Sequence, residues 1–218
     1  YITYQRDEVI MDTDKAYLLG ALVGGGTIGT DTVSIEFPYR QWGRSYKSPT
    51  RATEIFESIV NHVQPKLKQI YDIDSFPKYH PEWQIVCTNL SEKLKKDLLS
   101  YGITPSGILR EHASIKALLK EMDLVCKSEF VAGLADVIGS VQPTHRRFDM
   151  RHTIISFEIL GENFNLVIEL CHLLREMGCP CDQILWEHPN MHCGYDPWDD
   201  EWINKGNKLR VLTWEYIL

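Results

Sequence analysis

The sequence predicts an α+β protein made of two similar halves, residues 1–110 and 111–218. Each half opens with a helical run of small and apolar residues that ends in glycine, followed by a strand with period-two alternation. An amphipathic helix and further strands come next in both halves. The order repeats at an offset of 133 − 20 = 113 positions, measured between Gly20 and Gly133. Such a repeat is typical of an internal duplication.

In the first half, the opening helix follows a capping-type segment, Asp12-Thr13-Asp14, and is stopped by Gly24-Gly25-Gly26. A terminal helix capped near its start and ended by glycine closes this half, with no clear counterpart in the second. The other elements expected here are a strand at Thr32–Phe37, a helix at Ala52–Tyr71 that Pro65 ends or kinks, a strand at Glu82–Cys87 and the terminal helix at Asn89–Gly102.

In the second half, a small-residue helix is expected from Ser128, as its cap, to the glycine at 139. The elements expected after it are a strand at His152–Ile159, a helix at Glu162–Met177 ended by Gly178, and strands near Gln183–Trp186 and Lys208–Trp214.

Composition places the chain inside the cell, in the cytoplasm or on the nucleoid. No apolar stretch reaches the roughly 18 to 20 residues that a membrane span needs, and the N-terminus lacks a signal-peptide layout. Six cysteines without a tight framework of spacings fit reduced thiols. The net charge of −7 argues against nucleic-acid binding. However, acids crowd segments such as 196–201, whereas basic residues bunch elsewhere.

Two segments carry a family resemblance. Val131-Ala-Gly-Leu-Ala-Asp-Val-Ile-Gly-Ser140 resembles the signature of the LAGLIDADG homing endonucleases, and Leu18-Leu-Gly-Ala-Leu-Val-Gly-Gly-Gly26 resembles its looser form. With the elements that follow each motif, the resemblance covers nearly the whole chain and points to the single-chain, two-motif type. It implies two pseudo-symmetric αββαββ(α) halves packed around the motif helices, with antiparallel sheets that form a saddle over DNA.

The motif helices can pack closely only where the facing residues are small. The alternative is that both are ordinary core helices of an unrelated α+β protein. The small residues expected at the helix interface are Gly20, Ala21, Gly24, Ala132, Gly133 and Ala135.

The acids that the family uses are missing. The resemblance implies an acid just before the final glycine of each motif, holding divalent metal at the scissile phosphates, but these positions are Gly25 and Ile138. Asp136 points about 200° away from Ile138 on a helix, and Asp31 is a single displaced acid. We therefore expect a catalytically degenerate member with no catalytic residue, no metal site and no cofactor, which would use Mg²⁺ only if cleavage is retained.

Binding is expected in two basic segments, which we place at equivalent positions of the two halves. Solvated loops are the alternative for either segment alone. The DNA-binding candidates are Arg40, Arg44, Lys47 and Arg51 in the first segment, and His145, Arg146, Arg147, Arg151 and His152 in the second.

A Cys/His cluster, Cys179–Cys193 with Cys171 and His172, has no recognised zinc spacing, and we interpret Cys171 as a core residue. Trp198 and Trp202, among acids, fit a surface loop.

The leading hypothesis is a domain that recognises duplex DNA without cutting it. The alternatives are an RNA-binding, maturase-like splicing cofactor, a nuclease with relocated acids, and a protein-interaction scaffold. We expect a monomer, alone or as part of a larger protein. The start at Tyr1 rather than Met points to a trimmed chain or to missing leader residues.

Overall fold

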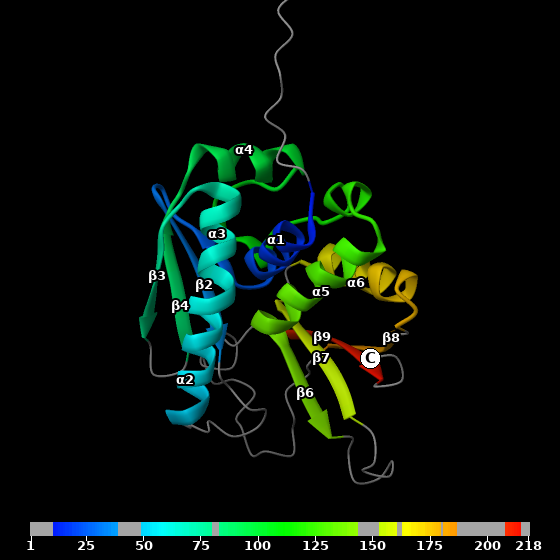
Figure 1. Ribbon diagram of the computed structural model, residues 1–218. Coiled ribbons are helices and arrows are strands. Elements are labelled where there is room, and N and C mark those ends of the chain that lie inside the picture. The colour runs from blue at the N-terminus through cyan, green and yellow to red at the C-terminus, as the bar shows by residue number, and fades with distance from the viewer. Residues whose placement is uncertain are drawn as a thin grey trace, which may run out of the picture.

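The protein has two antiparallel sheets on either side of a central pair of helices, α1 and α5 (Figure 1). The computed structural model describes residues 11–38, 49–79, 83–143, 153–160, 163–179, 181–186 and 208–214. Among these, no helix is long and apolar enough to cross a membrane. The two antiparallel sheets and the helices around them confirm the predicted α+β class.

The central helices are the two predicted small-residue runs. Helix α1 spans Thr13–Gly25, and Asp12 caps it by accepting a hydrogen bond from the Lys15 amide. Helix α5 spans Leu124–Ile138, and Asp123 caps it in the same way. The expected cap at Ser128 is wrong, because α5 begins one turn earlier. Both helices run directly into a strand at their final glycine.

The first sheet has five strands in the order β3-β4-β2-β1-β5. The predicted strands at 32–37 and 82–87 are present as β2 and β4. The other three strands were not predicted. The bounds are β1 Gly26–Ile28, β2 Thr32–Pro38, β3 Ser75–Tyr79, β4 Trp83–Asn89 and β5 Gly107–Ile108.

The second sheet repeats this connectivity. Its order, β6-β7-β9-β8, matches β1-β2-β4-β3 of the first sheet, strand for strand. Gly26 pairs with Ile35 of β2, and Gly139 pairs with Phe157 of β7, so each motif helix enters its sheet in the same way. The bounds are β6 Gly139–Pro143, β7 Thr153–Leu160, β8 Cys181–Trp186 and β9 Lys208–Trp214.

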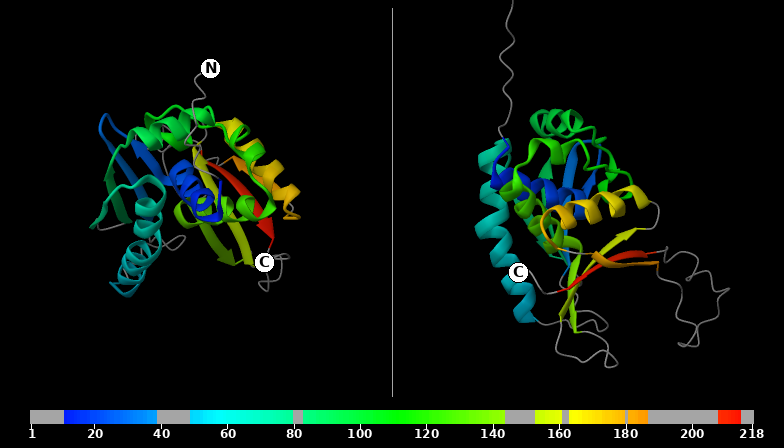
Figure 2. Two further views of the ribbon diagram at one scale, coloured as in Figure 1. Left: turned by 45° about the horizontal axis from the view of Figure 1, so that its top comes forward. Right: turned by 90° about the vertical axis from the view of Figure 1, so that its right-hand side faces the viewer.

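The remaining helices cover one face of each sheet (Figure 2). The predicted helix over 52–71 is a long rod that changes from α to π geometry just before Pro65. Proline has no amide hydrogen to donate and its ring clashes with the preceding turn, and the wider π turn accommodates both effects. The bounds are α2 Pro49–Ser58, π turn Ile59–Val63, α3 Gln64–Tyr71, α4 Glu92–Ser100 and α6 Phe164–Glu176, with short 3₁₀ turns at Leu109–Glu111 and Leu118–Glu121.

A buried ion pair joins three helices of the first half. Lys15 of α1 is fully buried, and its Nζ donates to Asp97 Oδ1 of α4 at 2.7 Å and to the Tyr101 hydroxyl at 2.8 Å. The Tyr71 hydroxyl, at the end of α3, donates to the other oxygen of Asp97 at 2.7 Å. Burial, reinforced by the Asp97 charge, raises the pKa of Tyr71 well above its usual value. The cluster therefore fixes α1 against α3 and α4.

Candidate nucleic-acid interface

The two motif helices cross with their backbones in contact. A Cβ on Gly20 would lie 2.0 Å from the Phe130 carbonyl oxygen, and a Cβ on Gly133 would lie 2.0 Å from the Tyr17 carbonyl oxygen. The contact is reciprocal, since each glycine faces the backbone three residues before the other. No side chain fits between the helices at this point, so the crossing requires glycine at both positions.

Other expected interface residues differ in their placement. Gly24 faces Val137 of α5, and Ala21 is buried, with its amide near Gly133. Ala135 is partly buried against the core, whereas Ala132 is exposed. The expectation for Ala132 is therefore wrong. It directly precedes Gly133, and one residue turns the helix by about 100°, which carries its side chain out of the crossing.

An apolar contact occupies the ends of the motif helices, where the family resemblance implies acids. A Cβ on Gly24 would meet a Val137 methyl at 2.4 Å and an Ile138 methyl at 3.5 Å. A Cβ on Gly25 would lie 2.7 Å from the Glu36 carbonyl oxygen and 3.0 Å from Val137 Cβ. Ile138 is buried. Neither Gly25 nor Ile138 has a side-chain oxygen that could bind a metal ion, and Gly25 has no room for a side chain unless its neighbours move.

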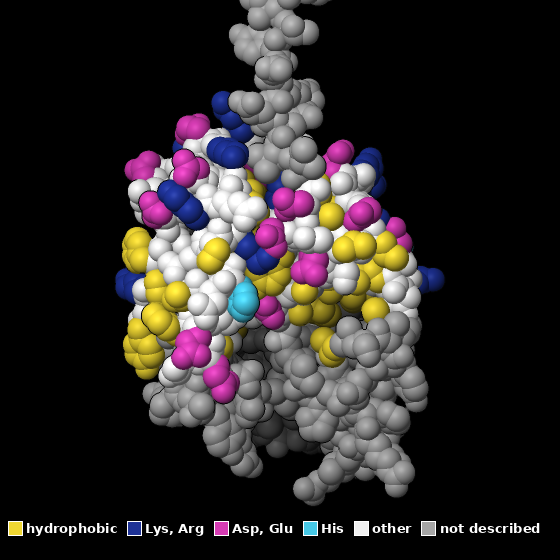
Figure 3. All heavy atoms as spheres, in the orientation of Figure 1, with side chains coloured by type: hydrophobic (Ala, Val, Ile, Leu, Met, Phe, Trp, Pro, Cys, Tyr) yellow, Lys and Arg dark blue, Asp and Glu magenta, His cyan; other side chains and the backbone are white. Residues whose placement is uncertain are grey.

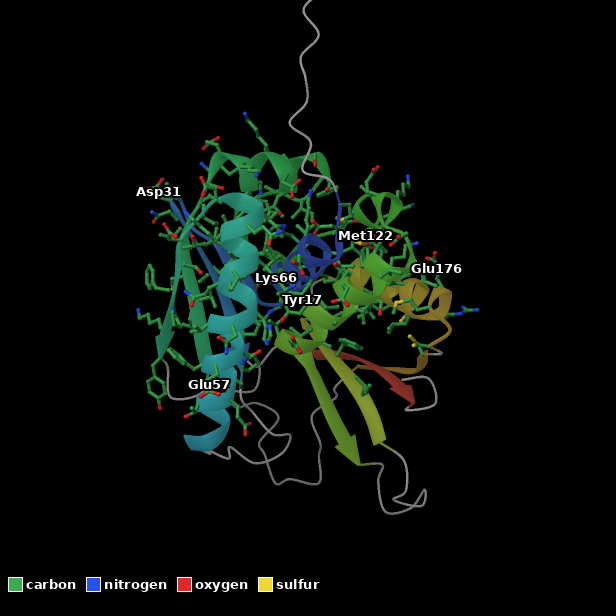
Figure 4. All side chains as sticks on the ribbon, in the orientation of Figure 1. Tyr17, Asp31, Glu57, Lys66, Met122 and Glu176 are labelled. Carbon is green, nitrogen blue, oxygen red and sulfur yellow. The ribbon has the colours of Figure 1, made fainter. Side chains whose placement is uncertain are left out.

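Asp136 is engaged in a contact between the helices. It accepts a hydrogen bond from the Tyr17 hydroxyl of α1 at 2.7 Å. Burial, together with the Asp136 charge, raises the pKa of Tyr17 far above its usual value. Lys66 of α3 lies over the Tyr17 ring, 5.7 Å from its centroid, and pairs with Asp14 (Figure 4). This cluster ties α1, α3 and α5 together.

Asp31 lies far from the helix ends. It sits in the turn of the β1–β2 hairpin, whereas Gly26 pairs with Ile35 at the opposite end of that hairpin. Figure 4 shows Asp31 at the outer tip of the sheet, well away from Tyr17. In this structure it does not supply a ligand beside Gly25.

Among the described residues, the open face of the first sheet carries one charge of each sign. Strand alternation puts Val33, Ile35 and Phe37 on the covered face. The register then puts the described charges Glu36 and Lys78 on the other face. Around them are the side chains of Thr27, Thr32, Ser34, Phe76, Ile85, Cys87, Asn89 and Ile108. In Figure 3, charges of both signs are interspersed over the described side chains of the face shown.

The candidate DNA-binding residues lie outside the described residues, except that Arg51 is in α2 and its side chain is not described. Their segments do not occupy equivalent places. Residues 39–48 follow the second strand of the first sheet, whereas 144–152 connect the first two strands of the second sheet. The expected equivalence is therefore wrong, because nine residues separate β6 from β7 in the sequence, whereas three separate β1 from β2.

The Cys/His cluster is described only in part. His188, His192 and Cys193 lie outside the described residues, as do Trp198 and Trp202. Within the described ranges, no group of three or more histidine, cysteine or acidic residues is placed to hold a metal ion.

The paired motif helices, the two antiparallel sheets and their matching connectivity define a LAGLIDADG homing-endonuclease-like fold. Among solved structures, the chain resembles I-DmoI in complex with DNA and calcium, with a TM-score of 0.52, 13% identity, and coverage of 95% of this chain and 85% of that one. Mesophilic variants of the homing endonuclease I-DmoI give a TM-score of 0.52 at 13% identity, covering 94% and 86%.

The N-terminal LAGLIDADG domain of WhiA gives a TM-score of 0.46 at 12% identity, covering 93% of this chain and 77% of that domain. The sequence matches no protein-family model and no curated protein.

Proposed function

We propose that this protein binds duplex DNA along the open faces of its two sheets and does not cleave it. The proposal rests on a fold like that of I-DmoI, whose structure is a complex with DNA, and on one local observation. That observation is the apolar contact of Gly24 and Gly25 with Val137 and Ile138 at the ends of the motif helices.

Hydrolysis of a phosphodiester by metal ions needs hard oxygen ligands, which hold Mg²⁺ against the attacking and leaving oxygens. Gly25 has no side chain, and Ile138 is a buried hydrocarbon. The carboxylate of Asp136 accepts a hydrogen bond from Tyr17, and Asp31 lies at the end of the β1–β2 hairpin that is distant from Gly25. The helix ends therefore support recognition without this chemistry.

Electrostatic attraction to phosphate is assigned to the two basic segments, residues 40–51 and 145–152. The described charges on the open face of the first sheet, Glu36 and Lys78, offset each other. That face offers hydroxyl, amide and apolar groups, which can contact base edges as well as phosphates. Binding is then expected to weaken with salt, with a slope of about 0.9 per phosphate contact in a log–log plot.

The test is selection from a random duplex pool at two salt concentrations, followed by sequencing of the retained DNA. Incubation with Mg²⁺, with and without a chelator, runs in parallel. Enrichment of one long site without cutting supports the proposal. Failure to retain DNA at either salt concentration would contradict the proposal. Preference for structured RNA in competition would favour the maturase-like alternative.

A second candidate is a nuclease with relocated acids, and Glu36 is the observation that favours it. Glu36 is on the open face of β2, and its carbonyl oxygen adjoins Gly25. Glu158 follows Phe157 on β7 as Glu36 follows Ile35 on β2. Chelator-sensitive nicking that disappears in Glu36→Gln would establish this candidate and overturn the proposal.

A further inference from the structure

Two cysteines lie close together where α6 packs on the second sheet. Cys171 is on α6, which packs on that sheet, and Cys181 is the first residue of β8. The Cys181 Sγ lies 3.9 Å from the Cys171 carbonyl oxygen, within hydrogen-bonding distance for sulfur. The Cys181 thiol also hydrogen-bonds to the Cys171 side chain. Both cysteines are partly buried and both are free thiols.

The connection between α6 and β8 brings these residues together. Gly178 adopts a left-handed conformation, with φ 80°, which ends the helix and reverses the chain. The Gly178 amide donates to the Arg175 carbonyl at 3.0 Å, and the Cys179 amide donates to the Leu174 carbonyl at 2.8 Å. The chain thus returns along α6, so Cys181 approaches a residue ten positions earlier.

We propose that Cys171 and Cys181 are a modification site, at which oxidation by a hydroperoxide forms a reversible disulfide between α6 and β8. This inference does not depend on the proposed DNA binding. It assigns a role to part of a cysteine cluster that has no zinc spacing.

Cys171 is the attacking thiol. The hydrogen bond from Cys181 lowers the pKa of the Cys171 thiol, although partial burial opposes this effect. Cys126 provides the contrast, since burial and its contact with Asp123 raise its pKa. The thiolate is the reactive form of cysteine, so peroxide is expected to select Cys171 over Cys126.

The disulfide forms in two steps. The Cys171 thiolate attacks one peroxide oxygen, the O–O bond breaks, and with one proton the products are a sulfenic acid and water from hydrogen peroxide, or an alcohol from an organic hydroperoxide. The Cys181 sulfur then attacks the Cys171 sulfur, and the hydroxyl leaves with the Cys181 proton as water. The two thiols lose two electrons and the peroxide gains them.

The bond would tie an edge strand to the helix that covers it. Strand β8 pairs only with β9 among the described strands, so one side of β8 has no neighbouring strand. Joining Cys181 to Cys171 would fix this edge against α6 and protect it from opening. The reduced protein lacks this constraint, and the edge opens more readily.

The experiment is a peroxide titration of the folded full chain, followed by alkylation of the remaining thiols and peptide mapping. Trypsin cuts after Arg175, so Cys171 and Cys181 fall on different peptides that stay linked only by the disulfide. Loss of free thiol is expected to be faster at Cys171 than at Cys126, because the pKa of Cys171 is lowered whereas the pKa of Cys126 is raised. Dithiothreitol should separate the linked peptides.

Three serine variants assign the partner. Cys179→Ser is the matched control, because Cys179 lies two residues from Cys181 and is also partly buried. The bond should persist in Cys179→Ser and vanish in Cys181→Ser and Cys171→Ser. A Cys171–Cys179 link in the unsubstituted protein, or oxidation without any Cys171–Cys181 link, would overturn the assignment. Because Cys179, Cys181 and Cys193 share one tryptic peptide, fragmentation of the linked peptides identifies the bonded cysteine, and in the wild type it does so even if a variant fails to fold.

Discussion

Replacing Gly20 by alanine tests the helix crossing on which the whole fold depends. The added Cβ would lie 2.0 Å from the Phe130 carbonyl oxygen, whereas real Cβ contacts are essentially never under 3.0 Å. The helices must therefore separate by about 1 Å, because a backbone atom cannot move away by changing rotamer. Overpacking costs about 3 kcal/mol here, and the better helix propensity of alanine returns about 1 kcal/mol, for a net loss of about 2 kcal/mol.

Urea unfolding, followed by circular dichroism, measures this loss. Gly133→Ala should cost a similar amount, since its Cβ would meet the Tyr17 carbonyl oxygen at the same distance. Ala132→Gly, on the exposed side of α5, is the control for helix propensity and should cost only about 1 kcal/mol. A Gly20→Ala protein as stable as wild type, or more stable, would refute the close backbone contact.

Three further outcomes are expected. Gly25→Asp should lower the unfolding free energy by about 1 to 3 kcal/mol without creating Mg²⁺-dependent nicking, measured by urea unfolding and a plasmid assay. Asp97→Ala should cost about 3 to 5 kcal/mol because it leaves Lys15 buried and charged, whereas the double variant with Lys15→Met should recover much of this loss. Hydrogen bonds from Cys126 lower the pKa of Asp123, so the ionised carboxylate stabilises the fold at a pH above its unfolded pKa of about 3.9. This stabilisation is lost as the pH falls through the lower pKa of the folded state. Asp123→Asn should keep the helix cap but flatten this part of the pH dependence of the melting temperature.

The sequence predicted the elements whose signals are local. Asp12 and the glycines bound α1, and the alternation of Thr32–Phe37 identified β2. Strand β1 has only three residues and begins at a glycine, so its structure depends on pairing with β2. Pro77 hid β3, because proline is compatible with a strand mainly at a sheet edge, where β3 lies.

Two features of the candidate site required the structure. Each basic segment comes after a motif helix in the sequence, which predicts equivalence, but residues 39–48 come after β2 in chain order, whereas residues 144–152 come between β6 and β7. Lys15 was missed although the signal was present. It lies on the same stripe as Leu18 and Leu19 of a buried helix, where a lysine requires a partner, and Asp97 has a similar place beside Leu94 and Leu98.

The absence of an acid at Gly25 and the tight packing at the ends of the motif helices are directly linked. Because Gly25 has no side chain, α1 approaches the backbone of β2 and the side chain of Val137 at distances that an aspartate would not allow. Trimming Val137 would relieve only one of these contacts, since the other partner is the Glu36 carbonyl oxygen. A metal-binding carboxylate therefore cannot be restored at Gly25 by side-chain changes alone. The strand itself would have to move, and a nuclease activity of this chain would need acids from other positions, with Glu36 the first to examine.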